Sequence, residues 1–118
     1  YIQSVMRMLF LNICLGVSSL FATTLAYFPW QKKIPNGNNV PHPCKTNQLW
    51  LGVGHNNSNG GGPLNIFGQH FREAGFEWTT NLCSMDSYGD VRTNGEELGD
   101  PSCIWKIGLI PTRIMNIS

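Results

Sequence analysis

An apolar run from Met8 to Ala26, "MLFLNICLGVSSLFATTLA", determines which part of this chain can belong to a folded domain. The single charge of Arg7 precedes the run, and small residues end it. This layout is typical of a secretory signal peptide, with cleavage expected after Ala26. A membrane anchor is the alternative, but the run is marginal in length and meets no further charge until Lys32. We therefore interpret residues 1–26 as a leader plus signal peptide, and residues 27–118 as the mature domain.

The mature chain would keep about 92 residues (118 − 26), which is enough for one small domain. Removing Arg7 leaves 8 − 1 = 7 basic residues against 7 acidic residues, so the formal net charge is close to zero. This balance argues against a nucleic-acid partner and against docking to an anionic membrane. We expect a secreted, extracellular protein with no stable membrane insertion after signal cleavage. The sequons at Asn56 and Asn116 fit that route and predict a glycoprotein.

Three cysteines remain once Cys14 leaves with the signal peptide. A small extracellular domain with a thin core usually needs disulfide bonds. We predict a bond between Cys44 and Cys83, which would tie the proline-rich first half to the helix before the acidic loop. Cys103 is then left unpaired, or its partner lies in another molecule or beyond Ser118 if the C-terminus is truncated. The cysteine spacing is not that of a zinc site.

Glycine and proline are dense after Tyr27, and periodic patterns are short. Residues 34–44 have turn chemistry, and short apolar runs predict strands at 47–55 and 103–111. Apolar residues at helical spacing predict helices within 65–75, 78–85 and 94–99, the first with Asn65 as its N-cap. The predicted fold is a small α+β or largely irregular disulfide-stapled domain with an EF-hand-like helix–loop–helix segment.

The acidic stretch "DSYGDVRTNGEELGDP" occupies the loop between the last two predicted helices. Its spacing places oxygen ligands at positions one, five, seven, nine and twelve of a twelve-residue calcium loop. The predicted ligands are the side chains of Asp86, Asp90, Asn94 and Glu97 and the backbone carbonyl of Arg92. Tyr88 and Val91 depart from the pattern, which wants a carboxylate and a glycine at the third and sixth positions. The alternative is an Asp-capped turn that keeps the loop shape without an ion.

Other chemistry has little support in the sequence. His42, His55 and His70 fall on three separate predicted elements, so a transition-metal cluster is not indicated. No serine or cysteine has a recognisable nucleophile setting, and the glycine-rich stretch lacks phosphate-binding spacing. The tryptophans are best explained as core residues. We therefore expect a protein that is not an enzyme.

Four segments carry a resemblance to a known family: "QKKIPNGNNVPHPC", "GVGHNNSNGGGPLNIFGQHF", "AGFEWTTNLCSMDSYGDVRTNGEELGDPSCIW" and "GLIPTR". Together they resemble the temptin family, the secreted water-borne pheromone proteins of marine molluscs, from Tyr27 to Ser118. The resemblance implies a non-enzymatic attractant that acts by binding a receptor or companion pheromone peptides such as attractin. The name also covers a domain in other secreted proteins, so the resemblance by itself does not prove pheromone activity.

The acidic loop of the family resembles "DSDGDGRTNGEELGDP", which implies a calcium-binding ancestor. Relative to it, Tyr88 removes a charge, and Val91 is a poor occupant of a positive-φ turn. We expect calcium binding here to be weak if it occurs. Two other functions stay open: an extracellular calcium-binding matrix or adhesion module, and an accessory domain of a secreted copper monooxygenase-like enzyme.

Overall fold

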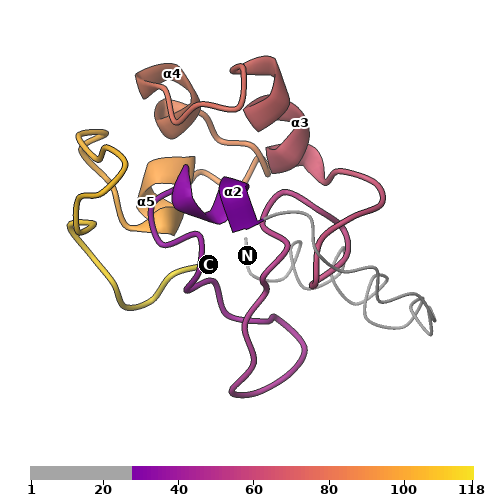
Figure 1. Cartoon of the computed structure of the whole chain (residues 1–118). Coiled ribbons are helices and arrows are strands. Elements are labelled where there is room, and N and C mark those ends of the chain that lie inside the picture. The colour runs from indigo at the N-terminus through magenta and orange to yellow at the C-terminus, as the bar shows by residue number, and fades with distance from the viewer. Residues whose placement is uncertain (1–27) are drawn as a thin grey trace.

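The computed structural model describes residues 28–118. Long irregular segments join four short helices, as Figure 1 shows. In chain order these are α2 (Phe28–Lys32), α3 (Ile66–Glu73), α4 (Thr80–Ser84) and α5 (Asn94–Leu98). The predicted leader and signal peptide lie outside the described residues. None of the helices described is long and apolar enough to cross a membrane.

The predicted strands do not form, so the β part of the α+β prediction is wrong and the largely irregular alternative holds. Within residues 28–118, β-type pairing is limited to two isolated bridges, Pro41 with Leu49 and His55 with Leu64. Proline has no backbone N–H to extend a ladder, which limits the first bridge. The predicted strand at 103–111 instead turns back on itself, where the Leu109 N–H donates to the Lys106 carbonyl at 3.0 Å.

Helix α3 forms where its apolar spacing predicts. The side chain of Asn65 accepts a hydrogen bond from the Gly68 N–H, which confirms the predicted N-cap. Phe67 and Phe71 face inward and are buried. Gly68 lies against the backbone of Gly54, and a Cβ there would collide with the Gly54 carbonyl oxygen. The helix can therefore approach the preceding loop closely because this position has no side chain.

Helices α4 and α5 flank the acidic loop, and local hydrogen bonds set their ends. Thr79 caps α4 by accepting from the Leu82 N–H. Thr93 and Glu96 form a reciprocal capping box at the start of α5. Gly99 ends α5 with a φ of 86°, a left-handed conformation that suits glycine.

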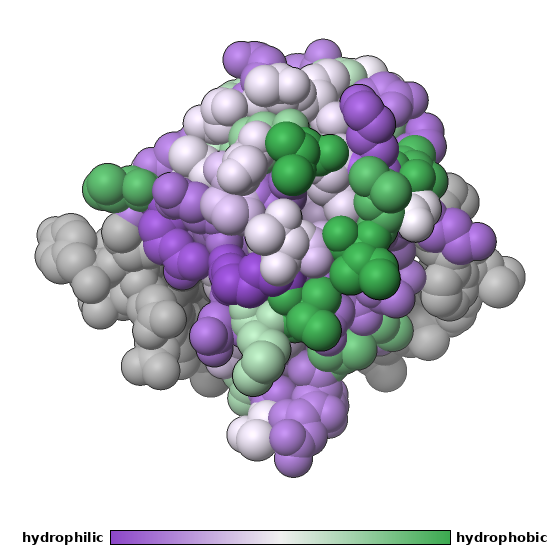
Figure 2. Space-filling model, turned by 90° about the vertical axis from the view of Figure 1, so that its left-hand side faces the viewer, coloured by the Kyte–Doolittle hydropathy of each residue, from purple (hydrophilic) through white to green (hydrophobic). Residues whose placement is uncertain are grey.

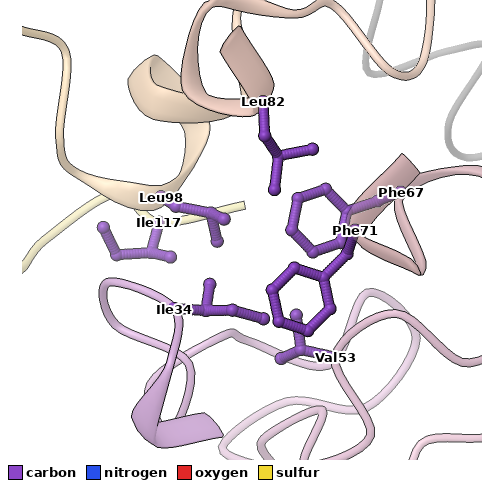
Figure 3. Close-up of a cluster of buried hydrophobic side chains, with 7 residues drawn as sticks. All are labelled: Ile34, Val53, Phe67, Phe71, Leu82, Leu98 and Ile117. Carbon is purple, nitrogen blue, oxygen red and sulfur yellow. The ribbon is translucent and has the colours of Figure 1, made fainter. Parts of the chain in front are cut away.

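The core takes roughly one apolar side chain from each part of the fold, and Figure 3 shows these side chains converging. Helices α3, α4 and α5 contribute inward-facing residues, and the loops and the C-terminal tail complete the cluster. Its buried members are Ile34, Val53, Phe67, Phe71, Leu82, Leu98 and Ile117. So thin a core leaves much of the tertiary order to polar contacts and covalent links.

Two buried polar side chains connect the irregular segments. The Asn36 amide donates to the carbonyls of Leu98 and Arg113, at 2.7 and 2.8 Å. Asp100, with no exposed surface, accepts from the Trp78 indole N–H at 2.9 Å and from the Ile104 N–H at 2.9 Å. These side-chain hydrogen bonds connect the irregular segments in place of the strand-to-strand hydrogen bonds of a sheet.

The disulfide in the described residues joins Cys83 to Cys103, with a sequence separation of 20. The prediction of a Cys44–Cys83 bond is therefore wrong, as is the prediction that Cys103 is unpaired or has its partner in another molecule or beyond Ser118. Cys44 is also disulfide-bonded. The physical reason lies in α5, whose Gly95 lets Cys83 approach the Asp100 backbone and so brings the segment after Asp100 against α4. The bond joins α4 to the segment that follows α5, rather than the two halves of the domain.

Candidate calcium loop

The loop from Asp86 to Glu97 has its shape set by its first residue. The Asp86 carboxylate accepts hydrogen bonds from the backbone N–H of Asp90 at 2.9 Å and of Val91 at 2.8 Å. These backbone donors hold the pKa of Asp86 below its usual range, the Asp90 N–H contributing most. An aspartate that closes a tight turn over the next five residues is the backbone arrangement with which a calcium loop begins.

The sixth position has the backbone that such a loop requires, although its residue is not glycine. Val91 has a φ of 68° and Gly89 a φ of 66°. The Val91 side chain is 88% exposed, so no packing contact offsets the strain of a β-branched residue in this region. The loop geometry thus overrides the local preference of Val91, as the sequence comparison with the family pattern predicts.

Asn94 does not point into the loop as a ligand. Its amide donates to the Leu82 carbonyl and to the Ser87 hydroxyl, both at 2.8 Å. Its carbonyl oxygen accepts from the Ser87 N–H at 3.4 Å. The side chain is 1% exposed and links α4 to the loop. The structure therefore gives Asn94 a structural role in place of the predicted ninth-position ligand.

Asp90 and Glu97 are buried beside each other, each 4% exposed. Burial raises the pKa of Glu97 to about 9, and the adjacent Asp90 carboxylate, to which a protonated Glu97 can donate, adds to the rise. At neutral pH Glu97 is therefore protonated in the folded state. The Oδ1 of Asp90 accepts from the Arg92 N–H at 3.0 Å. Its buried Oδ2 has no hydrogen-bond partner among the described residues.

Tyr88 brings a phenol where the family pattern has a carboxylate. Its ring packs against the hydrophobic core. Burial raises the pKa of the phenol above its usual range, and the carboxylates of Glu97 and Asp90 raise it further. The third position thus contributes a neutral side chain, and the loop has one negative charge fewer for an ion.

The donor set fits calcium in part. The carboxyl groups of Asp90 and Glu97 lie together, and the Asp90 Oδ2, which has no hydrogen-bond partner among residues 28–118, is an acceptor that a cation would satisfy. Against this, Asp86 is occupied by loop amides and Asn94 is turned away. Among residues 28–118, no group of three or more histidine, cysteine or acidic side chains has metal-binding geometry. The predicted ligands therefore lie in one loop, but they do not converge on a single point.

The three histidines singled out by the sequence do not come together, and one of them, His70, contacts the acidic loop. His55 is buried and stacks on Trp30 with ring centroids 4.9 Å apart. His70 approaches the Ser87 hydroxyl at 2.9 Å, and His42 Nδ1 accepts from the Cys44 N–H at 3.0 Å. The three histidines thus take part in three separate local structures.

The glycosylation sites stay predictions. Asn116 is exposed next to the buried Ile117, whereas Asn56 is half-buried and donates its N–H to the Pro63 carbonyl.

Asp100 is an important structural residue that the sequence pattern did not single out. Its position directly after the helix-ending Gly99 was the available signal, because a short acceptor there can bind the N–H groups of the next turn.

The fold and the loop together describe a small disulfide-stapled domain built around a degenerate calcium-type loop. The chain belongs to the temptin family, since the family described as Temptin C-terminal matches residues 24–118. Among curated proteins, temptin of Aplysia californica is 54% identical over 108 residues, which cover 92% of this chain and 86% of temptin. No solved structure matches.

Proposed function

We propose that this protein is a secreted, non-enzymatic signalling protein that acts as a water-borne attractant by binding a receptor or companion pheromone peptides. The observation that carries the proposal is the 54% identity to temptin across nearly the whole of both chains. A likeness that extends over the full domain supports a shared role better than a shared motif would, because it includes the surface as well as the core.

The surface offers a face for such a partner. Figure 2 shows apolar side chains gathered on the segment that follows α5. In the sequence of that segment, the exposed apolar residues include Ile104, Ile110 and Met115, which are 66%, 87% and 71% exposed. Gathered apolar surface of this kind marks protein interaction sites in soluble proteins. We place the receptor or peptide contact on this face.

The test is a behavioural assay in water. Purified protein added to one arm of a choice chamber is expected to draw conspecific animals, alone or with a companion peptide. The Ile110→Asp variant is expected to draw fewer, whereas Glu73→Gln, an exposed change on α3, is expected to match the parent. An absence of any response, with and without companion peptides, would refute the signalling function.

We propose weak calcium binding as a second property, which would suit an extracellular matrix or adhesion module as well as a signal. The support is the buried Oδ2 of Asp90, which lies next to Glu97 and has no hydrogen-bond partner in the described part of the chain, in a loop whose backbone follows a calcium-type turn. Because the raised pKa leaves Glu97 protonated at neutral pH, an ion would have to displace a proton, which weakens affinity. Asp86 and the Arg92 carbonyl would complete the site, with Asn94 after rotation.

Calorimetry with calcium tests this property. Glu97→Gln is expected to abolish the binding heat, and Glu73→Gln to leave it unchanged. The double variant Tyr88→Asp with Val91→Gly is expected to bind at least about tenfold more tightly, since it adds a charge and removes a backbone restriction together. A double variant no tighter than the parent would show that these two departures do not limit calcium binding.

A further inference from the structure

A groove of about 420 Å³ lies between α2 and the turn formed by residues 105–111. Its volume is within the range of small-molecule sites, roughly 300–1,000 Å³. The groove is separate from the acidic loop, and none of the predicted site residues lines it. Its lining residues are Gln31, Lys32, Ile34, Asn36, Asn38, Trp105, Ile107, Gly108, Leu109 and Pro111.

One wall of the groove is apolar and held in shape. The Trp105 indole N–H donates to the Leu109 carbonyl at 2.7 Å, which closes the turn on itself. The Trp105 backbone N–H donates to the buried carboxylate of Asp100, at 3.2 Å to each oxygen. Ile107 and Leu109 are 60% and 57% exposed, so a ligand chain lying against them would remove apolar surface from water.

The opposite wall carries a single charge. Among the described residues that line the groove, Lys32 is the one with an ionisable side chain, and the other polar side chains are the amides of Gln31, Asn36 and Asn38. The neighbouring Lys33 pairs with Glu77 at 3.8 Å, which is the ion pair found within residues 28–118. Lys32 is exposed and makes no such pair in that part of the chain. The groove is therefore complementary to a molecule with an aliphatic body and one anionic group.

We propose that this groove binds a medium-chain aliphatic carboxylate. The hydrocarbon chain lies along Trp105, Ile107 and Leu109, and the carboxylate lies next to the Lys32 ammonium group. A long-chain lipid bilayer and a second copy of the protein are the competing occupants, and both would cover the exposed Ile110 as well as the groove. The proposal goes beyond the signalling role, and binding is measured without reference to behaviour.

The test is calorimetric titration of the full, oxidised protein with sodium decanoate below its micelle concentration. We expect saturable binding of one decanoate per chain. Butyrate, which has the charge without the chain, and decanol, which has the chain without the charge, are both expected to bind at least about tenfold more weakly.

Two matched pairs of variants locate the site. Lys32→Gln is expected to weaken decanoate binding roughly fivefold, whereas Lys33→Gln, one residue away and outside the groove, leaves it unchanged. Leu109→Asn is expected to weaken it about tenfold, whereas Ile110→Asn, adjacent but outside the lining, leaves it unchanged. All four positions are at least partly exposed, so the variants are expected to fold.

Several outcomes would overturn the proposal. These are the absence of saturable binding, equal effects of Lys32→Gln and Lys33→Gln, or equal effects of Leu109→Asn and Ile110→Asn. Sedimentation with phosphatidylserine vesicles that depends on Ile110 as strongly as on Leu109 would assign the surface to a membrane. A monomer–dimer equilibrium that decanoate does not shift, and that Leu109→Asn and Ile110→Asn weaken equally, would assign it to a second copy.

Discussion

Val91 is a residue whose backbone conformation conflicts with the preference of its side chain. Its φ of 68° is one that glycine or asparagine adopts readily and a β-branched residue does not. The loop keeps this conformation because the Asp86 carboxylate binds the N–H groups of both Asp90 and Val91. The strain is confined to one exposed residue, so removing it is expected to raise the free energy of unfolding.

Val91→Gly is expected to raise the free energy of unfolding by about 1 kcal/mol, since relief of the left-handed strain exceeds the added flexibility of the unfolded chain. Urea denaturation measures it. Asn47→Gly is the matched control: Asn47 is also exposed, with a φ of 59°, but asparagine tolerates this region. The control is expected to be neutral or slightly destabilising. If both variants change stability equally, strain at Val91 is not the cause.

Glu97 makes the stability of the fold depend on pH. Its pKa rises from about 4.5 in the unfolded chain to about 9 in the folded protein, chiefly through burial. The folded state therefore holds the proton more tightly, so its stabilising contribution is full below about pH 4.5 and is lost progressively as the pH rises toward 9. In calcium-free buffer we expect the free energy of unfolding to fall between pH 5 and pH 8.

Denaturation at several pH values checks this, with Glu97→Gln as the decisive variant. Glutamine keeps the shape and cannot ionise, so the decline across this window is expected to flatten. Glu73→Gln, an exposed carboxyl on α3, is expected to keep the slope of the parent. An unchanged slope in Glu97→Gln would mean that another group is responsible.

Among the secondary-structure elements, the helices with apolar spacing and a capping residue could be predicted from the sequence. Asn65 and the Phe67/Phe71 pair predicted α3, and the short α5 was expected at about the residues where it forms, Asn94–Leu98. The disulfide could not be predicted in this way. A thin core suggested a tether between the two halves, but the partner of Cys83 depends on how α5 turns the chain back at Gly99, which is a tertiary effect.

Loss of the Cys83–Cys103 bond is expected to lower the free energy of unfolding by about 3 kcal/mol, the value for a closed loop of 20 residues. The Cys83→Ala, Cys103→Ala double variant in urea measures it. Peptide mapping of the oxidised parent is expected to recover Cys83 linked to Cys103. Recovery of Cys83 linked to Cys44 would contradict the fold described here.

For the whole molecule, the sequence predicted the class of domain better than its internal order. Length, cysteines and dense glycine indicated a small, irregular, stapled domain, and the described residues have that form. The predicted strand at 47–55 failed because this run bends into a tight turn, in which the His55 N–H donates to the Gly52 carbonyl. Buried groups such as Asn36 and Asp100 bind the backbone in place of a sheet. The ligand spacing predicted the loop shape but could not show that Asn94 turns toward Leu82.

We infer that the folded, oxidised surface of this protein is the signal. The most direct measurement compares native protein with the same protein reduced and alkylated, each added to water in the choice assay at equal concentration. Animals are expected to move toward the native protein and to ignore the unfolded one, because the exposed face around Ile110 exists only when the segment after α5 is held in place. Equal attraction to both samples would contradict it and would place the signal in a linear segment of the chain.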